Sequence, residues 1–118
     1  MRSAKTFVPN RGDIIWLNFN PQSGHEQAGK RPALVLSPAL YNRKTSLLIC
    51  CPITSRIKGY PFEVLLPPQS KLQGVVLSDQ VKSLDWRARR ATLAGKSGSE
   101  VLSEVHAKLD VLLNPATM

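Results

Sequence analysis

Residues 24–38, GHEQAGKRPALVLSP, decide between two folds because a near-match to a nucleotide-binding loop is followed by a short apolar run. A Walker A loop requires G-x-x-x-x-G-K followed by Ser or Thr, and it opens a helix whose N-terminal amides bind phosphate. Here Arg31 replaces the hydroxyl residue and Pro32 follows it. The apolar run 33–36 has the length of a strand. The stretch therefore predicts a polar loop that leads into a strand, and not an ATP site.

Several other segments also have the length and composition of strands. Turn residues separate them, including Asn20-Pro21, Ser37-Pro38 and Pro67-Pro68. A strand over 86–92 would place Arg87 and Arg89 on one face, because side chains alternate along a strand. The expected strands are 14–19, 33–36, 47–51, 62–66, 74–77 and 86–92.

The C-terminal stretch changes to the period of a helix. Ser97 or Ser99 is expected to cap its start, and Asn114-Pro115 to end it. The sequence thus predicts a small, strongly bent antiparallel sheet or barrel closed by a C-terminal helix. The apolar stripe of this helix consists of Val101, Leu102, Val105, Leu109, Leu112 and Leu113.

Composition limits the class of protein. A chain of 118 residues is expected to form one domain, residues 1–118, around one hydrophobic core. Cys50 and Cys51 are adjacent in an apolar run and fit a reducing compartment as small core residues. The sequence has no apolar segment of about 20 residues, so we expect a cytoplasmic protein without a membrane segment. The net charge of +8 favours a polyanionic partner, although solvated basic faces explain it equally well.

The candidate chemistry lies in the polar loop and beyond the third apolar run. His25 and His106 are far apart, and no other cluster has the spacing of metal ligands, so we expect no metal and no cofactor. Cleaving RNA without a metal needs a base, cations on the phosphoryl oxygens and a proton donor. Glu26 could accept a proton, Arg31 offers a planar fork for two phosphate oxygens, and Thr54 offers a neutral hydrogen-bond donor. A structural alternative stays open, in which Glu26 pairs with a neighbouring cation and Thr54 satisfies a strand end.

The same residues carry a family resemblance, which runs from Phe7 to about Leu113. On these motifs the chain resembles the MazF/PemK-type toxins, sequence-specific endoribonucleases of bacterial toxin–antitoxin pairs. Motifs of this length and order are specific, whereas an isolated G-D-x-x-W would not be. The motifs are GDIIW (12–16), EQAGKRPALVLSP (26–38), KGYPFEV (58–64) and DQVKS (79–83).

The resemblance implies an SH3-like antiparallel barrel with a C-terminal helix, a homodimer, and metal-independent cleavage of single-stranded RNA. In such toxins the Arg before the Pro of the second strand and the Thr at the end of the next strand form the catalytic pair. These positions are Arg31 and Thr54 here, and the loop carboxylate Glu26 is the third candidate. The implied products are a 2′,3′-cyclic phosphate and a 5′-hydroxyl. Because an arginine stays protonated, Glu26 or a water that it orients is the easier general base.

Single-stranded RNA is held by basic grooves and by stacking or splaying of its bases. The expected RNA-binding residues are Lys30, Arg56, Lys58, Arg87 and Arg89. The strand pattern around the two tryptophans, at positions 16 and 86, favours core or dimer packing over base stacking. The same cationic surface suits a cognate antitoxin whose acidic disordered tail folds on binding.

Two other functions fit the predicted fold. A CcdB-like toxin would bind gyrase without nuclease activity, although such poisons rely on an aromatic residue near a C-terminus that here reads LLNPATM. A basic RNA-binding module without activity is the second. The RNA sequence that is recognised and the identity of the antitoxin cannot be predicted from this chain.

Overall fold

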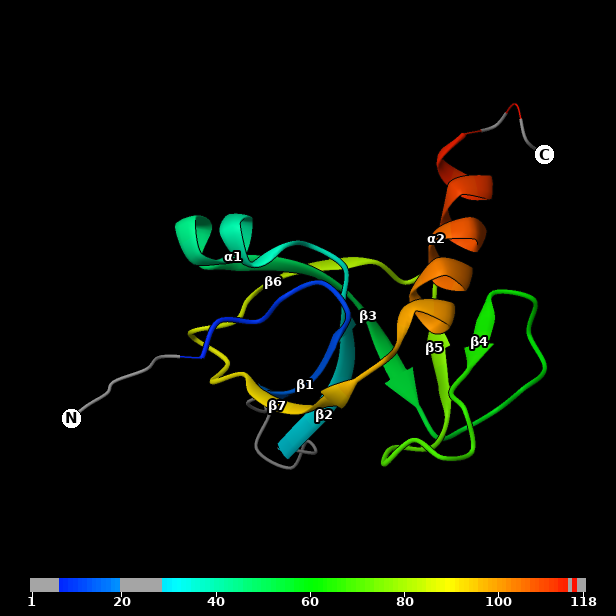
Figure 1. Ribbon diagram of the computed structural model, residues 1–118, viewed down its shortest axis with the longest axis horizontal. Coiled ribbons are helices and arrows are strands. Elements are labelled where there is room, and N and C mark those ends of the chain that lie inside the picture. The colour runs from blue at the N-terminus through cyan, green and yellow to red at the C-terminus, as the bar shows by residue number, and fades with distance from the viewer. Residues whose placement is uncertain (1–6, 20–28, 115, 117–118) are drawn as a thin grey trace.

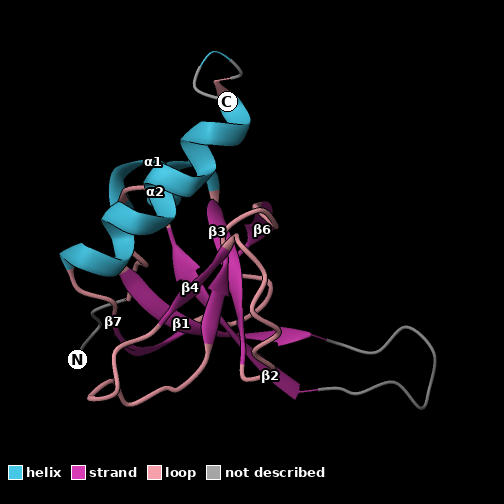
Figure 2. Ribbon diagram, turned by 90° about the vertical axis from the view of Figure 1, so that its right-hand side faces the viewer, coloured by secondary structure: helices cyan, strands magenta, loops and turns pink. Residues whose placement is uncertain are grey.

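The computed structural model describes residues 7–19, 29–114 and 116. The elements follow the order β1 (Asp13–Phe19), β2 (Gly29–Val35), α1 (Ala39–Thr45), β3 (Leu47–Thr54), β4 (Glu63–Leu65), β5 (Val75–Leu77), β6 (Lys82–Asp85), β7 (Thr92–Lys96) and α2 (Ser99–Leu113). Figure 1 shows a curled sheet with α2 lying beside β4 and β5, and Figure 2 shows the helices beside the sheet. No helix in the described part of the chain is long and apolar enough to span a membrane.

The strands form one antiparallel sheet with the order β4-β5-β3-β2-β1-β7. The eight-residue β3 is at its centre, since it pairs with β2, β5 and β6. The ladder between β1 and β7 joins the two ends of the chain. The predicted fold class, a small SH3-like antiparallel barrel with a C-terminal helix, is confirmed, with the sheet curled into a half-barrel (Figure 1).

The sheet separates two hydrophobic clusters because successive side chains of a strand point to opposite faces. Ile14 belongs to a first cluster with Val101 and Val105 of α2. Ile15 belongs to a second cluster, which also contains Trp86. Trp86 is 4% exposed and its indole N–H donates to the Asn42 carbonyl, so its core role is confirmed.

The two cysteines are buried, free and divided between these clusters, Cys51 in the first and Cys50 in the second. Burial raises the pKa of the Cys50 thiol to about 11 and that of Cys51 to about 12. Both thiols are therefore protonated at neutral pH, which confirms the prediction that they are small core residues.

The predicted strand over 86–92 is wrong. The chain turns at 86–90, and β6 and β7 lie on either side of the turn. The Asp85 side chain accepts hydrogen bonds from the Ala88 amide and the Ser46 hydroxyl, which lower the pKa of Asp85. Arg90 has a φ of 51°, in the left-handed region. The apparent period of 2 thus came from arginines exposed by a turn.

Two details of the helices also differ from the prediction. The N-cap of α2 is Gly98, without a side-chain cap, so neither Ser97 nor Ser99 caps it. Helix α1 was not predicted. Its Asn42 is fully buried, accepts from the Ser37 hydroxyl and donates to the carbonyls of Pro9 and Ser37.

Candidate active site

The register between β2 and β3 relates Arg31 to Thr54. The ladder pairs Ala33 with Pro52 and Leu34 with Cys51. The ladder ends at Ala33 and Pro52, and its continuation by two residues along each strand would bring Arg31 level with Thr54. Both side chains then lie on the face of the second hydrophobic cluster, since side chains two residues apart share a face. Arg31 is exposed at the start of β2, and Thr54 is half-buried at the end of β3.

An aromatic ring lies beside Arg31. The Arg31 guanidinium carbon is 5.8 Å from the centroid of the Phe19 ring, and that of Arg89 is 4.6 Å from the same centroid. Arg89 also donates to the Asn18 carbonyl over 3.4 Å. The turn at 86–90 thus brings a second cation to the end of β1, near Arg31.

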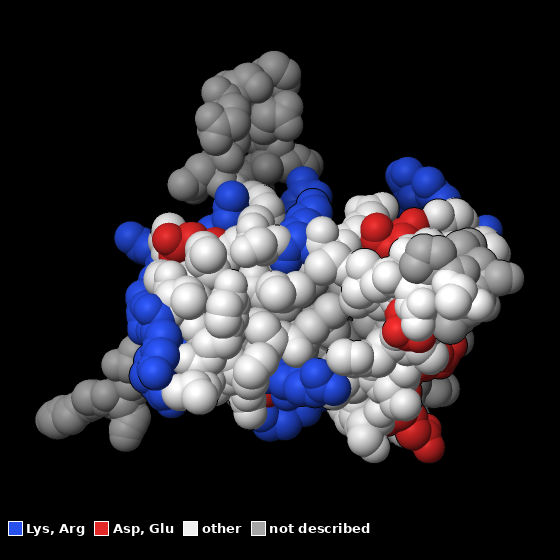
Figure 3. All heavy atoms as spheres, turned by 90° about the horizontal axis from the view of Figure 1, so that it is seen from above, with Lys and Arg blue, Asp and Glu red and all other residues white. Residues whose placement is uncertain are grey.

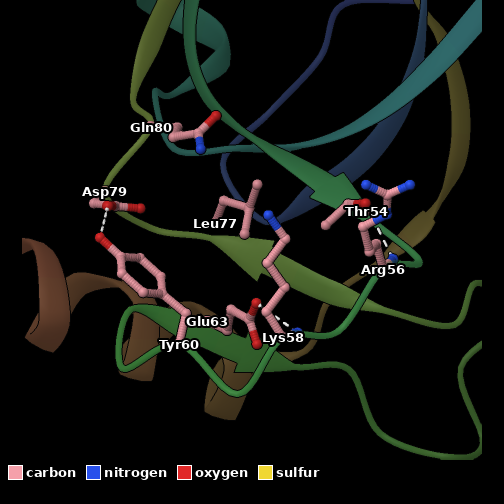
Figure 4. Close-up of a pocket in the computed structure, with 8 residues that line it drawn as sticks. All are labelled: Thr54, Arg56, Lys58, Tyr60, Glu63, Leu77, Asp79 and Gln80. Atoms are coloured by element: carbon pink, nitrogen blue, oxygen red, sulfur yellow. Dashed lines mark hydrogen bonds between the residues drawn. The ribbon is translucent and has the colours of Figure 1, made fainter.

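A pocket of about 310 Å³ opens at the end of β3. Its polar lining combines cations with carboxylates, and Figure 4 shows the Lys58 side chain extending into it. The cations can bind a phosphate of a nucleotide, and the carboxylates can accept hydrogen bonds from the polar edge of its base. The lining residues are Thr54, Arg56, Lys58, Tyr60, Glu63, Leu77, Asp79 and Gln80.

Hydrogen bonds hold the loop that follows β3. The Glu63 carboxylate accepts from the amides of Lys58 and Gly59, at 3.1 and 3.0 Å. The Tyr60 hydroxyl donates to Asp79 Oδ2 over 2.6 Å, and this bond raises the pKa of Tyr60. Asp79 Oδ1 is buried and has no hydrogen-bond partner among the described residues. This oxygen can accept a hydrogen bond from a ligand.

The Thr54 hydroxyl accepts a hydrogen bond in the structure, and its own hydrogen remains available to donate. Its Oγ1 accepts from the Arg56 amide over 3.1 Å. A hydroxyl has one hydrogen to give and two lone pairs. Within the described residues no acceptor takes that hydrogen, so it is available to a phosphoryl oxygen.

The structure brings together only some of the predicted residues. Arg56 and Lys58 line the pocket with Thr54, and Arg89 lies near Arg31. Lys30 pairs with Asn18, which places it on the opposite face of the sheet from Arg31.

The two predicted arginines of the 86–90 turn separate. Arg87 lies over Trp86 at 4.4 Å and donates to the Arg43 carbonyl, so it does not share the face of Arg89. The expectation that Arg87 and Arg89 lie on one face is therefore wrong. Glu26 and His25 lie outside the described residues. His106 lies half-buried on α2.

Some site residues were missed although the sequence carried a signal for them. Tyr60, Asp79 and Gln80 belong to the KGYPFEV and DQVKS motifs, but of these motifs only Lys58 was expected to bind RNA. Nothing in the sequence indicated that Phe19 contacts two arginines.

The surface charge is not confined to this site. On the face shown in Figure 3, Lys and Arg side chains form separate groups and no continuous stripe. Among the residues that the structure describes, no three His, Cys, Asp or Glu side chains are grouped as metal ligands.

Comparison with known proteins identifies the protein family of this chain. Residues 10–113 match the family described as PemK-like, MazF-like toxin of type II toxin–antitoxin systems. The chain belongs to this family of toxins. The endoribonuclease toxin MazF of Escherichia coli K12 is 53% identical over 107 residues, which cover 91% of this chain and 96% of that protein. The endoribonuclease toxin ChpB of the same strain is 38% identical, over 87% of this chain and 92% of that protein.

A solved structure has the same fold. The crystal structure of MazE-MazF (Form-II) from Deinococcus radiodurans aligns with a TM-score of 0.89 and 57% identity, over 92% of this chain and 97% of that chain. The protein is an endoribonuclease toxin of a toxin–antitoxin pair, as the sequence predicted. These relatives favour this function over the CcdB-like alternative.

Proposed function

We propose that the protein cleaves single-stranded RNA at a specific sequence without a metal ion, using Arg31 and Thr54 as the catalytic pair. The observation that supports this proposal is the β2–β3 register, because its continuation beyond Ala33 and Pro52 would bring the two residues level on the face of the second cluster. In this proposal the scissile phosphate lies between them, and the pocket beyond Thr54 holds adjoining parts of the RNA.

The proposed reaction begins with attack of the 2′-hydroxyl oxygen on the adjacent phosphorus. The P–O5′ bond breaks, which leaves a 2′,3′-cyclic phosphate and a 5′-hydroxyl. Arg31 binds two phosphoryl oxygens with its planar guanidinium as negative charge grows, and the Thr54 hydroxyl donates a further hydrogen bond. Glu26, or a water that it orients, takes the proton of the 2′-hydroxyl. The 5′-oxygen leaves as the alcohol after it takes a proton from solvent water.

A cleavage assay tests this function directly. The purified protein is incubated with a long RNA in excess EDTA, the cut sites are mapped by sequencing, and the new ends are analysed. We expect cuts at one short sequence in unpaired regions, with cyclic phosphate and 5′-hydroxyl ends. Uncut RNA, or activity that only Mg²⁺ restores, contradicts the proposal.

Replacing Thr54 by valine removes the hydroxyl and keeps the shape of the side chain. We expect kcat to fall about tenfold with little change in KM, because a hydrogen bond to a charged group is lost in the transition state. Thr54→Ser, which keeps the hydroxyl, serves as the matched control and should retain most of the activity. Equal activity of the valine and wild-type proteins would leave Thr54 with the strand-end role alone.

We infer that the partners include a cognate antitoxin with an acidic disordered tail. The support is the net charge of +8 and the similarity to MazE-MazF structures. Arg56 and Lys58, the basic residues that line the pocket, would bind both RNA and the antitoxin tail. The buried free thiols of Cys50 and Cys51 fit a cytoplasmic, reducing location.

We also infer a homodimer. On β3, Cys51 and Ile53 are buried in the first cluster, whereas Leu47 and Ile49 on the same face are 37% and 36% exposed. Leaving these apolar side chains in water is unfavourable, and a second copy can cover them. Analytical ultracentrifugation measures the resulting mass.

A further inference from the structure

The ring of Phe19 contacts two arginines that come from different parts of the chain. Arg31 belongs to β2, Arg89 to the turn between β6 and β7, and Phe19 ends β1. Both guanidinium carbons are within 6 Å of the ring centroid, the range in which a cation is attracted to an aromatic face. The two cations are therefore at most about 10 Å apart.

Neither arginine is bound to a carboxylate of the described residues. Within the described part of the chain, the ion pair formed is that of Lys96 with Asp13, and neither Arg31 nor Arg89 pairs with a carboxylate. A carboxylate would orient a guanidinium but would also neutralise it. A neutral ring orients the group through its face and leaves the N–H donors at the edge free for phosphate oxygens.

The position of Phe19 on the sheet explains why it reaches Arg31. Phe19 pairs with Gly29, and Leu17 pairs with Arg31, so Phe19 and Arg31 are diagonal neighbours on one face. Gly29 has no side chain to come between them. Phe19 also packs against the second hydrophobic cluster, which anchors the ring.

We propose that Phe19 is a positioning residue for cleavage, which holds Arg31 toward the scissile phosphate and Arg89 toward a neighbouring phosphate of the same RNA strand. This inference rests on the proposed role of Arg31. A ring that confines the Arg31 guanidinium before RNA binds reduces the freedom lost on reaching the transition state. Phe19 itself does not touch the reacting atoms.

The test compares Phe19→Leu with Phe19→Trp in single-turnover and steady-state assays on a short RNA that contains one mapped cut site. Leucine keeps apolar packing and removes the aromatic face, whereas tryptophan restores a face that attracts cations more strongly. We expect Phe19→Leu to lower kcat about fivefold with KM changed less than twofold, and Phe19→Trp to stay within about twofold of wild type.

Phe7→Leu is the matched control, because Phe7 packs against the same cluster and forms no contact with a cation among the described residues. It should leave kcat within about twofold. All rates are compared at a temperature at which circular dichroism shows each variant to be folded. Equal loss in Phe19→Leu and Phe19→Trp, or the same loss in Phe7→Leu, indicates packing alone and overturns the proposal.

A second measurement does not depend on cleavage. The δ protons of isotopically labelled Arg31 should show a ring-current shift by NMR in the wild-type protein and in Phe19→Trp, and lose it in Phe19→Leu. An unshifted Arg31 in the wild-type protein overturns the positioning role. If this shift is present and wild-type protein leaves RNA intact in EDTA, the proposed function fails and the contact stands.

Discussion

Arg31→Ala is expected to lower the rate of RNA cleavage by about 10²- to 10³-fold, the largest catalytic effect among the described residues. In the proposed mechanism the guanidinium supplies two parallel hydrogen bonds and a positive charge where the phosphoryl oxygens become more negative. Because Arg31 is exposed at the start of β2, removing its side chain should leave the fold intact. Single-turnover cleavage of an RNA with one cut site measures the effect, and a thermal melt verifies the fold.

Two further variants separate charge from geometry. Arg31→Lys keeps the charge but loses the planar fork, so we expect it to recover only a small part of the rate. Arg11→Ala removes an exposed arginine next to the other end of β1 and should cut at nearly the wild-type rate. A fall of less than tenfold in Arg31→Ala would assign the main electrostatic role to another group.

Gly74→Ala is expected to lower the free energy of unfolding by about 3 kcal/mol, because it combines backbone strain with a clash. Gly74 has a φ of 133°, a conformation that side chains rarely allow. A Cβ atom there would lie 2.3 Å from the Thr54 carbonyl oxygen and 3.2 Å from the Ser55 Cα. A shift of melting temperature by about 10 °C would report this loss.

The same substitution should also lower cleavage beyond its effect on stability. Val75, the next residue, pairs with Thr54, so relief of the clash displaces the end of β3 that carries the hydroxyl that we propose to be catalytic. Gly95→Ala is the matched control, since Gly95 lacks a positive φ and a Cβ atom added there would meet no neighbouring group within 4 Å. Its unfolding free energy should change by about 0.5 kcal/mol or less. Equal stability of the two variants would contradict the close packing of Gly74 on Thr54.

The fold could be predicted where periodicity reflects burial. The segments that became β1 to β5 alternate or run apolar because they line the two clusters, and α2 buries Val101 and Val105 from its stripe. The turn at 86–90 and helix α1 could not be predicted in this way. They are held by long-range bonds, such as Ser46 to Asp85 and Trp86 to Asn42, which leave no local pattern.

Some residues of the candidate site could also be predicted from the sequence, and others could not. Arg31 and Thr54 are candidates because of their side-chain chemistry, and the family resemblance implies that they form a pair; their roles stay predictions. The contacts of Phe19 with Arg31 and Arg89 depend on pairing between β1 and β2 and on the 86–90 turn. The pocket likewise needs residues from β3, β4 and β5 and from the loops beside them. Sequence spacing alone does not report such assembly.

The ladder between β1 and β7 has a consequence for synthesis of the toxin. The β7-facing edge of β1, residues 13–16, has no partner until Thr92–Lys96 has been made, more than 70 residues later. At about 5–20 residues per second, a nascent chain carries this open edge for roughly 4 to 15 s. Arg89, which precedes β7, also comes late. The sheet of the toxin can therefore close along this edge only after β7 has been synthesised.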